Sequence, residues 1–350
     1  MVKFDYKGFK QIPLPTEKEI MVDWGSDNDS PLISVLCTTF NQQAYIEDAI
    51  RGFLIQKTDF PFEIVIHDDA SLDETPGILK GYLKKYPKII RLILQEDNQY
   101  SQGKRVSAIA AATAKGKYLA ICEGDDFWID SRKLQQQKNT IDQNLDCSLI
   151  VHQCYLMKGD NVALKPAMGH GDSQRDVNIS EVVSSGYQFS PTASYLISKE
   201  IYTILPGWIE KAPVGDYFLE SYSFKLGRVI YLPFVFSVYR RWAEGSWTED
   251  LNRTGIKLRE TSRRMYESLN LMRQDEFFDS EDIEKKMAAS LFGMAKGYLL
   301  EGKYAEFKES IEKSVSFNRY FSKFQRILFL VRFFPRTTRK LLSFYNGWRN

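Results

Sequence analysis

The chain has 350 residues, of which 43% are hydrophobic and 26% are charged; this composition is typical of folded globular proteins and argues against a disordered chain. The formal net charge of +2 provides no strong overall field, so we expect no nucleic-acid partner. Four cysteines without a C-x-x-C pair and three scattered histidines argue against a disulfide framework and a zinc site. We therefore expect a reducing, cytoplasmic compartment, and carboxylate ligands for any bound metal.

The first 30 residues lack the pattern of a regular element. Residues 1–11 alternate charged and aromatic side chains without the apolar core of a signal peptide, and residues 25–31 are rich in turn-forming residues. No run of 18 or more apolar residues occurs, so we expect no membrane-spanning helix. We interpret residues 1–30 as an irregular N-terminal arm.

Strand-like and helix-like segments alternate between residues 32 and 122. Apolar, β-branched runs predict strands at 32–39, 62–66, 89–94 and 118–122. Helical spacing of apolar residues predicts helices at 45–54, 78–83 and 106–114. A strand about every 30 residues is typical of βαβ units, so we predict an α/β protein with a mostly parallel sheet. In such sheets, ligands bind beyond the carboxyl ends of the strands.

The pattern changes near Asp250. The preceding residues, 147–240, are predicted to mix strands and helices. Helical periodicity then dominates in segments 253–272, 281–300 and 304–315. We therefore expect an α/β domain over 31–250, a helical region over 251–318 and a separate tail over 319–350.

Two acidic pairs, Asp68-Asp69 and Asp125-Asp126, directly follow predicted strands. Adjacent carboxylates repel each other unless a cation neutralises them. Hard cations such as Mg²⁺ take oxygen ligands and usually bind substrate phosphates as well. The alternative for both pairs is a loop that caps the following helix.

The end of the first predicted strand carries Thr38 and Phe40. A hydroxyl and an aromatic ring at a sheet edge suit a stacked nucleobase, and they also suit a plain turn. The sequence contains neither a G-x-G-x-x-G motif nor a Walker A loop, so dinucleotide and P-loop binding gain no support.

Three segments form a specific ordered pattern, namely PLISVLCTTFNQQAYIEDAI, FEIVIHDDASLDET and AKGKYLAICEGDDFWIDSRKLQQQ. Together they resemble the family-2 glycosyltransferases of GT-A fold, closely over residues 31–145 and loosely over 146–248. The resemblance implies a GT-A domain over 31–250. It also implies transfer of a sugar, with inversion, from a nucleoside-diphosphate sugar to an acceptor hydroxyl.

The resemblance further implies roles for the residues at the strand ends. They are Thr38, Phe40, Asp68 and Asp69 around the nucleotide base, Asp125 on the ribose side and Asp126 as the metal ligand. The implied cofactor is Mn²⁺ or Mg²⁺, and the implied donor is a UDP-sugar. The implied enzyme is a hexosyl- or N-acetylhexosaminyl-transferase of bacterial surface-glycan synthesis, with a glycan or lipid-linked glycan as acceptor.

An inverting displacement needs a base that takes the proton of the acceptor hydroxyl. The segment Pro213–Leu219 resembles the family's base site, and Asp216 matches the base; the alternative is an N-cap of the next helix. A later segment resembles the family's Tyr-Arg-x-His pattern, but Trp242 replaces the His and leaves one metal contact open. Arg240 or Arg241 is an alternative ligand for the diphosphate.

Two other functions remain open at this point. A nucleotidyltransferase also uses acidic pairs on an α/β sheet, but a Gly-rich phosphate loop would be expected after the first strand, and residues 38–43 contain no glycine. A catalytically inactive protein of the same fold could bind a sugar nucleotide or a glycan, and Trp242 is the feature that favours this alternative.

The tail differs in charge from the rest of the chain. Residues 314–350 contain eight basic and no acidic residues, whereas the remainder contains 39 basic and 45 acidic residues. Basic and large apolar residues interleave over 319–350, which predicts an interfacial helix on an anionic membrane, split at Pro335. We therefore expect peripheral attachment to the inner face of the plasma membrane. The alternatives are a helix packed on the catalytic domain and, less favoured, aromatic stacking on nucleic acid.

Overall fold

The computed structural model describes residues 4–25, 30–159, 161–162, 166–241, 243 and 254–340. The chain forms two compact units. The first consists of Met1–Asn178, Phe189–Leu205 and Leu219–Ala243, and the second of Ile179–Gln188, Pro206–Phe218 and Glu244–Asn350. Two short segments from the middle of the sequence therefore belong to the same unit as the C-terminal helices.

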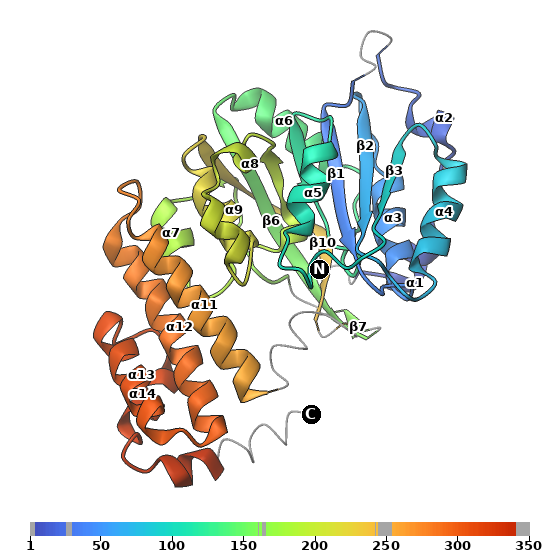
Figure 1. The fold of residues 1–350 in the computed structure, drawn as a ribbon. Coiled ribbons are helices and arrows are strands. Elements are labelled where there is room, and N and C mark those ends of the chain that lie inside the picture. Colours follow the sequence, from blue (N-terminus) through green and yellow to red (C-terminus); the bar gives the residue numbers. More distant parts are fainter. Residues whose placement is uncertain are drawn as a thin grey trace. The chain divides into compact units, whose positions relative to one another are not determined.

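The first unit is built around one curled sheet, drawn from blue to yellow in Figure 1. In the described residues the strands follow the order β3-β2-β1-β4-β9-β6-β10-β5, with β7 beside β6 and β8 beside β10. They are β1 (Ile33–Thr39), β2 (Phe62–Asp68), β3 (Ile90–Leu94), β4 (Tyr118–Ile121), β5 (Phe127–Trp128), β6 (Cys147–Lys158), β7 (Asn161–Val162), β8 (Arg175–Asp176), β9 (Leu196–Ser198) and β10 (Arg228–Arg240). The ladders β3-β2, β2-β1, β1-β4 and β6-β10 are parallel. β9 pairs antiparallel with β4 and β6, and β5 pairs antiparallel with β10. The predicted α/β class with a mostly parallel sheet is confirmed.

Helices pack on the parallel part of this sheet. They are α3 (Ile46–Leu54), α4 (Thr75–Lys85), α5 (Val106–Thr113) and α6 (Lys133–Gln143), with the short α8 (Ile201–Ile204) and the 3₁₀ turn η1 (Thr192–Ser194) near β9. Val35 and Ile64 pack with Phe53 of α3 in one cluster, while α5 lies against β1 and β2. Every residue of β2 is buried. Such strands read as continuous apolar runs, which is why the sequence located them.

The N-terminal residues contain regular structure, so the expectation of an irregular arm was wrong. They form α1 (Tyr6–Gln11) and α2 (Glu17–Ile20). Asp5 caps α1, and Thr16 with Glu19 forms a reciprocal capping box at the start of α2. Phe9 and Ile20 are buried in the first unit and anchor the two helices.

The second unit is helical, as predicted. Its helices are α7 (Ile179–Val183), α11 (Gly255–Met272), α12 (Ser280–Glu301), α13 (Tyr304–Phe317) and α14 (Lys323–Leu330), with the 3₁₀ turn η2 (Gly207–Lys211) and the start of α9 (Asp216–Ser223). Gly302 ends α12 with a φ of +82°, which lets the Lys303 N–H donate to the Tyr298 carbonyl at 2.9 Å. Phe307 and Leu328 belong to the small core of α12, α13 and α14. None of the helices in the described ranges is long and apolar enough to cross a membrane.

Candidate active site

The carboxyl ends of β1, β2 and β4 meet at one edge of the sheet. Thr39 on β1 pairs with Asp68 on β2, and the Asp69 N–H donates to the Thr39 carbonyl at 3.0 Å. The Gly124 N–H, beyond the end of β4, donates to the Thr38 carbonyl at 3.0 Å. The structure thus brings the end of the first strand together with both acidic pairs, at the edge where parallel sheets bind ligands.

The acidic turn after β4 packs closely against β1. A Cβ at Gly124 would lie 2.4 Å from Gln42 Oε1 and 3.0 Å from Thr39 Cβ. A larger residue at this position would therefore have to displace the Gln42 side chain and would crowd Thr39.

Two residues at this edge adopt a backbone conformation that normally favours glycine. Asn41 and Ala70 have φ angles of +52° and +63°, a geometry that costs about 1–3 kcal/mol each and concentrates at functional sites. Hydrogen bonds between the two loops hold them in place. The Asn41 N–H donates to Ser71 Oγ at 2.8 Å, and the Leu72 N–H donates to Asn41 Oδ1 at 2.8 Å.

The carboxylates of Asp68 and Asp69 are buried, and all four oxygens accept hydrogen bonds. Asp68 accepts from the Ser71 hydroxyl at 2.6 Å and the Ser71 N–H at 3.1 Å. Asp69 accepts from the N–H groups of Gln99 at 2.8 Å and Tyr100 at 3.0 Å. Asp68 thus shapes the turn after β2, and Asp69 fixes the loop after β3. Their contact with a nucleotide stays a prediction.

Asp126 is buried as well, whereas Asp125 is half-buried, and the environment of this pair differs from that of the first. Asp126 Oδ1 accepts from the Arg240 N–H at 2.8 Å, whereas Asp126 Oδ2 is buried without a hydrogen-bond partner among the described residues. Burial raises the pKa of Asp126 well above its ordinary value, and the charges of Asp125 and Glu123 raise it further. Burial also raises the pKa of Asp125. A nearby cation would neutralise the negative charge of these carboxylates.

Arg240, at the end of β10, holds the acidic turn in place. Its Nη1 donates to the Asp125 carbonyl at 2.6 Å, and its backbone N–H binds Asp126. Its Nη2 forms a buried ion pair with Asp48 of α3, and the Tyr6 hydroxyl of α1 donates to the same Asp48 carboxylate at 2.6 Å. The position of the acidic turn therefore depends on α1, α3 and β10 together.

This network corrects the expectation that Arg240 could bind the diphosphate, because its guanidinium is buried and committed to protein partners. Arg241 is exposed, and Trp242 lies outside the described residues. Tyr6 and Asp48 were not predicted to support the site. Asp48 lies on the side of its helix opposite the predicted apolar face, where an acidic residue is ordinarily solvated. Its partner lies 192 residues further along the chain, so no local signal identifies the pair.

Phe40 and Thr38 occupy the open part of the same edge. Phe40 is 44% exposed although it directly follows a buried strand, and Thr38 is half-buried. An exposed aromatic ring beside the strand ends offers a face on which a flat ligand can stack. The position therefore suits the role that the sequence predicts for Phe40.

Asp216 is the first residue of α9 and belongs to the second unit. It is half-buried, and its Oδ1 accepts from the Tyr217 N–H at 2.8 Å. Tyr217 is itself fixed, since its hydroxyl donates to the Val183 carbonyl at 3.0 Å. The carboxylate thus accepts from a backbone N–H in the first turn, but Asp216 is the first helical residue and not the N-cap that the alternative expects. Its role as a base stays a prediction.

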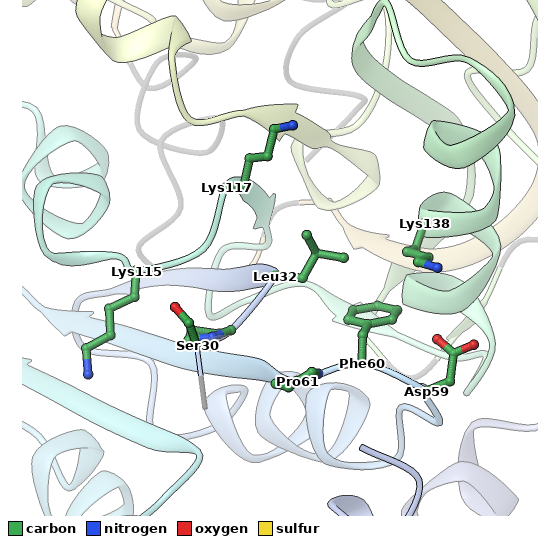
Figure 2. Close-up of a pocket in the computed structure, with 9 residues that line it drawn as sticks. Ser30, Leu32, Asp59, Phe60, Pro61, Lys115, Lys117 and Lys138 are labelled. Carbon is green, nitrogen blue, oxygen red and sulfur yellow. The ribbon is translucent and has the colours of Figure 1, made fainter. Parts of the chain in front are cut away.

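A cavity of about 590 Å³ opens at the opposite edge of the sheet (Figure 2). Leu32, Pro61 and Lys117 line it, and each directly precedes a strand, so the cavity adjoins the amino ends of β1, β2 and β4. Another lining residue, Lys138, forms an ion pair with Asp142 at 2.6 Å. Because the cavity lies away from the strand ends that carry the acidic pairs, it is not the candidate site.

The acidic turn fits a divalent cation by the chemistry of its donor. Asp126 Oδ2 is a buried carboxylate oxygen without a partner, and Mg²⁺ and Mn²⁺ prefer oxygen ligands. Within the described ranges, no three or more His, Cys, Asp or Glu side chains group around a metal position. One or two carboxylates are a common protein contribution to Mg²⁺ sites that also bind substrate phosphates. Asp126, with Asp125 beside it, would hold such an ion.

Comparison with known proteins places this segment in a family. Residues 34–190 match the family described as glycosyl transferase family 2. Protein Rv1520 of Mycobacterium tuberculosis is 32% identical over 223 residues, which cover 61% of this chain and 60% of Rv1520. The poly(ribitol-phosphate) beta-N-acetylglucosaminyltransferase TarS of Staphylococcus aureus is 28% identical over 176 residues, 49% of this chain and 26% of TarS. The matched region thus spans less than two thirds of either relative.

Solved structures share the fold. Residues 1–349 of TarS in complex with UDP-GlcNAc have a TM-score of 0.60 at 16% identity, over 90% of this chain and 91% of that chain. The mannosyltransferase PcManGT from Pyrobaculum calidifontis, in complex with GDP-Man and Mn²⁺, has a TM-score of 0.53 at 13% identity, over 97% and 92%. Identities this low establish the fold alone, which is the GT-A fold expected from the sequence. The family match includes both acidic pairs, and residues 34–190 of this chain form a glycosyl transferase family 2 domain.

Proposed function

We propose that the chain is a metal-dependent glycosyltransferase that moves a sugar, with inversion, from a nucleoside-diphosphate sugar to an acceptor hydroxyl. One observation carries the proposal: Asp126 Oδ2 is buried without a partner among the described residues, at the edge where the parallel strands end. The family match supports sugar transfer. The fold neighbours bound to UDP-GlcNAc and GDP-Man support a nucleotide sugar as the donor.

Asp126 is the proposed ligand of Mn²⁺ or Mg²⁺. When bound, the ion would neutralise charge on the departing diphosphate. Asp125 is proposed to face the ribose side. Phe40 offers its exposed ring to the base, with Thr38 beside it. Asp69 contributes by fixing the loop after β3 through its bonds to two backbone N–H groups.

The proposed donor is a UDP-sugar that carries a hexose or an N-acetylhexosamine. The proposed acceptor is a glycan or lipid-linked glycan of bacterial surface-glycan synthesis. TarS supports both proposals, because it was solved with UDP-GlcNAc and its name gives poly(ribitol-phosphate) as the acceptor. The proposed location is the cytoplasm, at the inner face of the plasma membrane.

Asp216 is the proposed general base. In a single displacement the acceptor oxygen must lose its proton as it attacks the sugar carbon, and a carboxylate can accept that proton. The hydrogen bond from the Tyr217 N–H occupies Oδ1. Asn at this position can keep an acceptor oxygen for that N–H while it removes the basicity of the carboxylate, which makes Asp216→Asn a suitable test.

The first experiment measures UDP release and sugar transfer from a panel of UDP-sugars, with and without Mn²⁺. Turnover that requires the metal supports the proposal. Binding of the donor without turnover, over a panel of glycan acceptors, would favour the inactive binding protein. Formation of a nucleotide sugar from a sugar phosphate and a nucleoside triphosphate would instead indicate a nucleotidyltransferase.

The second experiment compares Asp216→Asn with Asp279→Asn. Asp279 also serves a helix start, since it caps α12 by accepting from the Glu281 N–H at 2.7 Å. We expect Asp216→Asn to lower turnover by about 10²–10⁴-fold while donor affinity is unchanged. The matched Asp279→Asn variant should leave turnover unchanged. An equal loss of donor binding in Asp216→Asn would contradict the role as a base.

A further inference from the structure

The segment that follows α13 has one face buried and one face exposed. Gln325 and Leu328 of α14 are buried in the second unit. The opposite face exposes large apolar side chains, which continue before and after the helix. These define the tail surface: Tyr320 (72% exposed), Phe324 (38%), Ile327 (53%), Leu330 (71%), Phe333 (60%) and Phe334 (69%). The alternative of a packed C-terminal helix therefore describes the buried face of α14, which packs on α13, and it leaves the exposed face unexplained.

The exposed apolar area is large for a protein surface. Aromatic side chains, which are four of the six, bury about 150–250 Å² each when covered, and Ile327 and Leu330 add a smaller area. At these exposed fractions, the six side chains present on the order of several hundred Å². The largest apolar patch on a typical monomer measures about 300–600 Å² and is often functional. The tail surface is therefore large enough to be a binding surface.

Basic side chains lie on the same exposed face. On a helix with about 100° per residue, Lys323, Phe324, Arg326, Ile327 and Leu330 share one sector, and all five are exposed. Residues 314–350 contain no acid. In the described part of the chain, neither Lys323 nor Arg326 forms an ion pair, in contrast to Arg332, which binds Glu312 at 2.9 Å.

Pro335 divides the segment, as the sequence predicted. α14 ends at Leu330, and helical residues resume at Pro335 and continue to Lys340. Proline fits the first turn of a helix because its missing N–H has no partner there. The predicted tail continues to Asn350, but residues 341–350 lie outside the described residues.

We propose that the tail surface binds an anionic lipid bilayer. Only a bilayer offers anionic groups and an apolar layer side by side, which matches the interleaved basic and apolar side chains. A second copy of the chain would bring like charges together. Nucleic acid would match the charges and the aromatic rings of this surface, but it would leave the exposed aliphatic Ile327 and Leu330 without an apolar partner. This surface belongs to the second unit and does not depend on the transfer reaction.

The test is flotation of the full chain with phosphatidylglycerol-containing vesicles and with pure phosphatidylcholine vesicles. We expect binding to the anionic vesicles at low salt, a decline as salt increases, and little binding to phosphatidylcholine. Arg326→Gln combined with Ile327→Ser should weaken the partitioning at least about tenfold, because one basic residue contributes about fivefold and the isoleucine adds its apolar burial. Thermal melting checks that the variant stays folded.

The matched control combines Ile256→Ser with Lys257→Gln on α11. These residues are also an exposed apolar and basic pair of the second unit, and this variant should bind vesicles as the parent does. Three outcomes would overturn the proposal. They are equal binding to both kinds of vesicle, no binding to anionic vesicles at low salt, and a concentration-dependent oligomer that the Arg326/Ile327 variant converts to a monomer.

Discussion

The two acidic pairs look alike in the sequence and differ in the structure. Each follows a buried parallel strand at the same edge of the sheet. Asp68, Asp69 and Asp126 are buried there, and Asp125 is half-buried. All four carboxylate oxygens of Asp68 and Asp69 accept hydrogen bonds from the chain. In the other pair, Asp126 keeps one buried oxygen without a partner in the described residues. The first pair shapes loops, and the second is left with capacity to bind a ligand.

The difference shows why an acidic pair alone predicts little. A buried carboxylate is costly unless the chain satisfies it. A satisfied one therefore stabilises the fold, whereas an unsatisfied one has the capacity to accept a further partner such as water or a cation. Substitutions that separate these two roles test the difference between the two acidic pairs.

The largest effect is expected for Asp126→Asn. It should lower turnover at least about 10⁴-fold, because the metal stabilises several kcal/mol of charge in the transition state. The melting temperature should stay equal or increase, since an unpartnered buried charge is removed. Electron paramagnetic resonance of bound Mn²⁺ in the presence of UDP gives a readout besides activity. Asp142→Asn, on the exposed side of α6, is the control and should bind Mn²⁺ as the parent does. Normal Mn²⁺ binding by Asp126→Asn would contradict the assignment of Asp126 as the metal ligand.

The next effect is expected for Arg240→Ala. It leaves Asp48 buried without its cation, which should lower the free energy of unfolding by about 3–5 kcal/mol. It also frees the acidic turn, so Mn²⁺ affinity should fall. Arg240→Lys restores the charge, but a lysine cannot contact both Asp48 and the Asp125 carbonyl in the geometry of a guanidinium. This variant should recover part of the stability and a smaller part of the Mn²⁺ affinity. Denaturant unfolding and Mn²⁺ titration measure both, and unchanged affinity in a folded Arg240→Lys variant would argue against positioning.

Asp69→Asn should show the opposite pattern to Asp126→Asn. Its amide would place a donor against one of two backbone N–H groups, which should cost about 1–3 kcal/mol of stability. The loop after β3 should become more accessible to proteases near Gln99. Mn²⁺ affinity should stay close to that of the parent. A loss of Mn²⁺ binding without a loss of stability would mean that the two pairs act alike.

The smallest effect is expected for Tyr6→Phe. It removes the hydrogen bond that Tyr6 donates to Asp48 and the one that it accepts from Arg240 Nη2 at 3.2 Å, and it keeps the ion pair between Asp48 and Arg240. The loss of stability should be about 1–2 kcal/mol. Thermal unfolding measures it. A loss as large as that of Arg240→Ala would show that α1 carries more of the network than its one hydroxyl explains.

The sequence located elements whose signal is local. β1 and β2 read as apolar runs because both faces are covered, and Pro335 marked the break in the C-terminal segment. Thr16 and Glu19 also formed a local signal for α2, a capping box that the sequence analysis overlooked. The network around Asp126 was beyond such reasoning, because Asp48 and Arg240 are 192 residues apart. Nothing in the strings Asp68-Asp69 and Asp125-Asp126 distinguishes satisfied from unsatisfied oxygens.

The contacts among Tyr6, Asp48 and Arg240 can form only late during synthesis of the chain. A ribosome that adds about 5–20 residues per second needs roughly 10–40 s to extend the chain from Asp48 to Arg240. Before Arg240 is synthesised, the nascent chain already contains the acidic turn, but the residue that holds this turn in place is absent. A fragment limited to residues 34–190, the family-matched segment, would carry every acid of the turn and neither Tyr6 nor Arg240. Expressed alone, it should fail to reach the native arrangement of this edge.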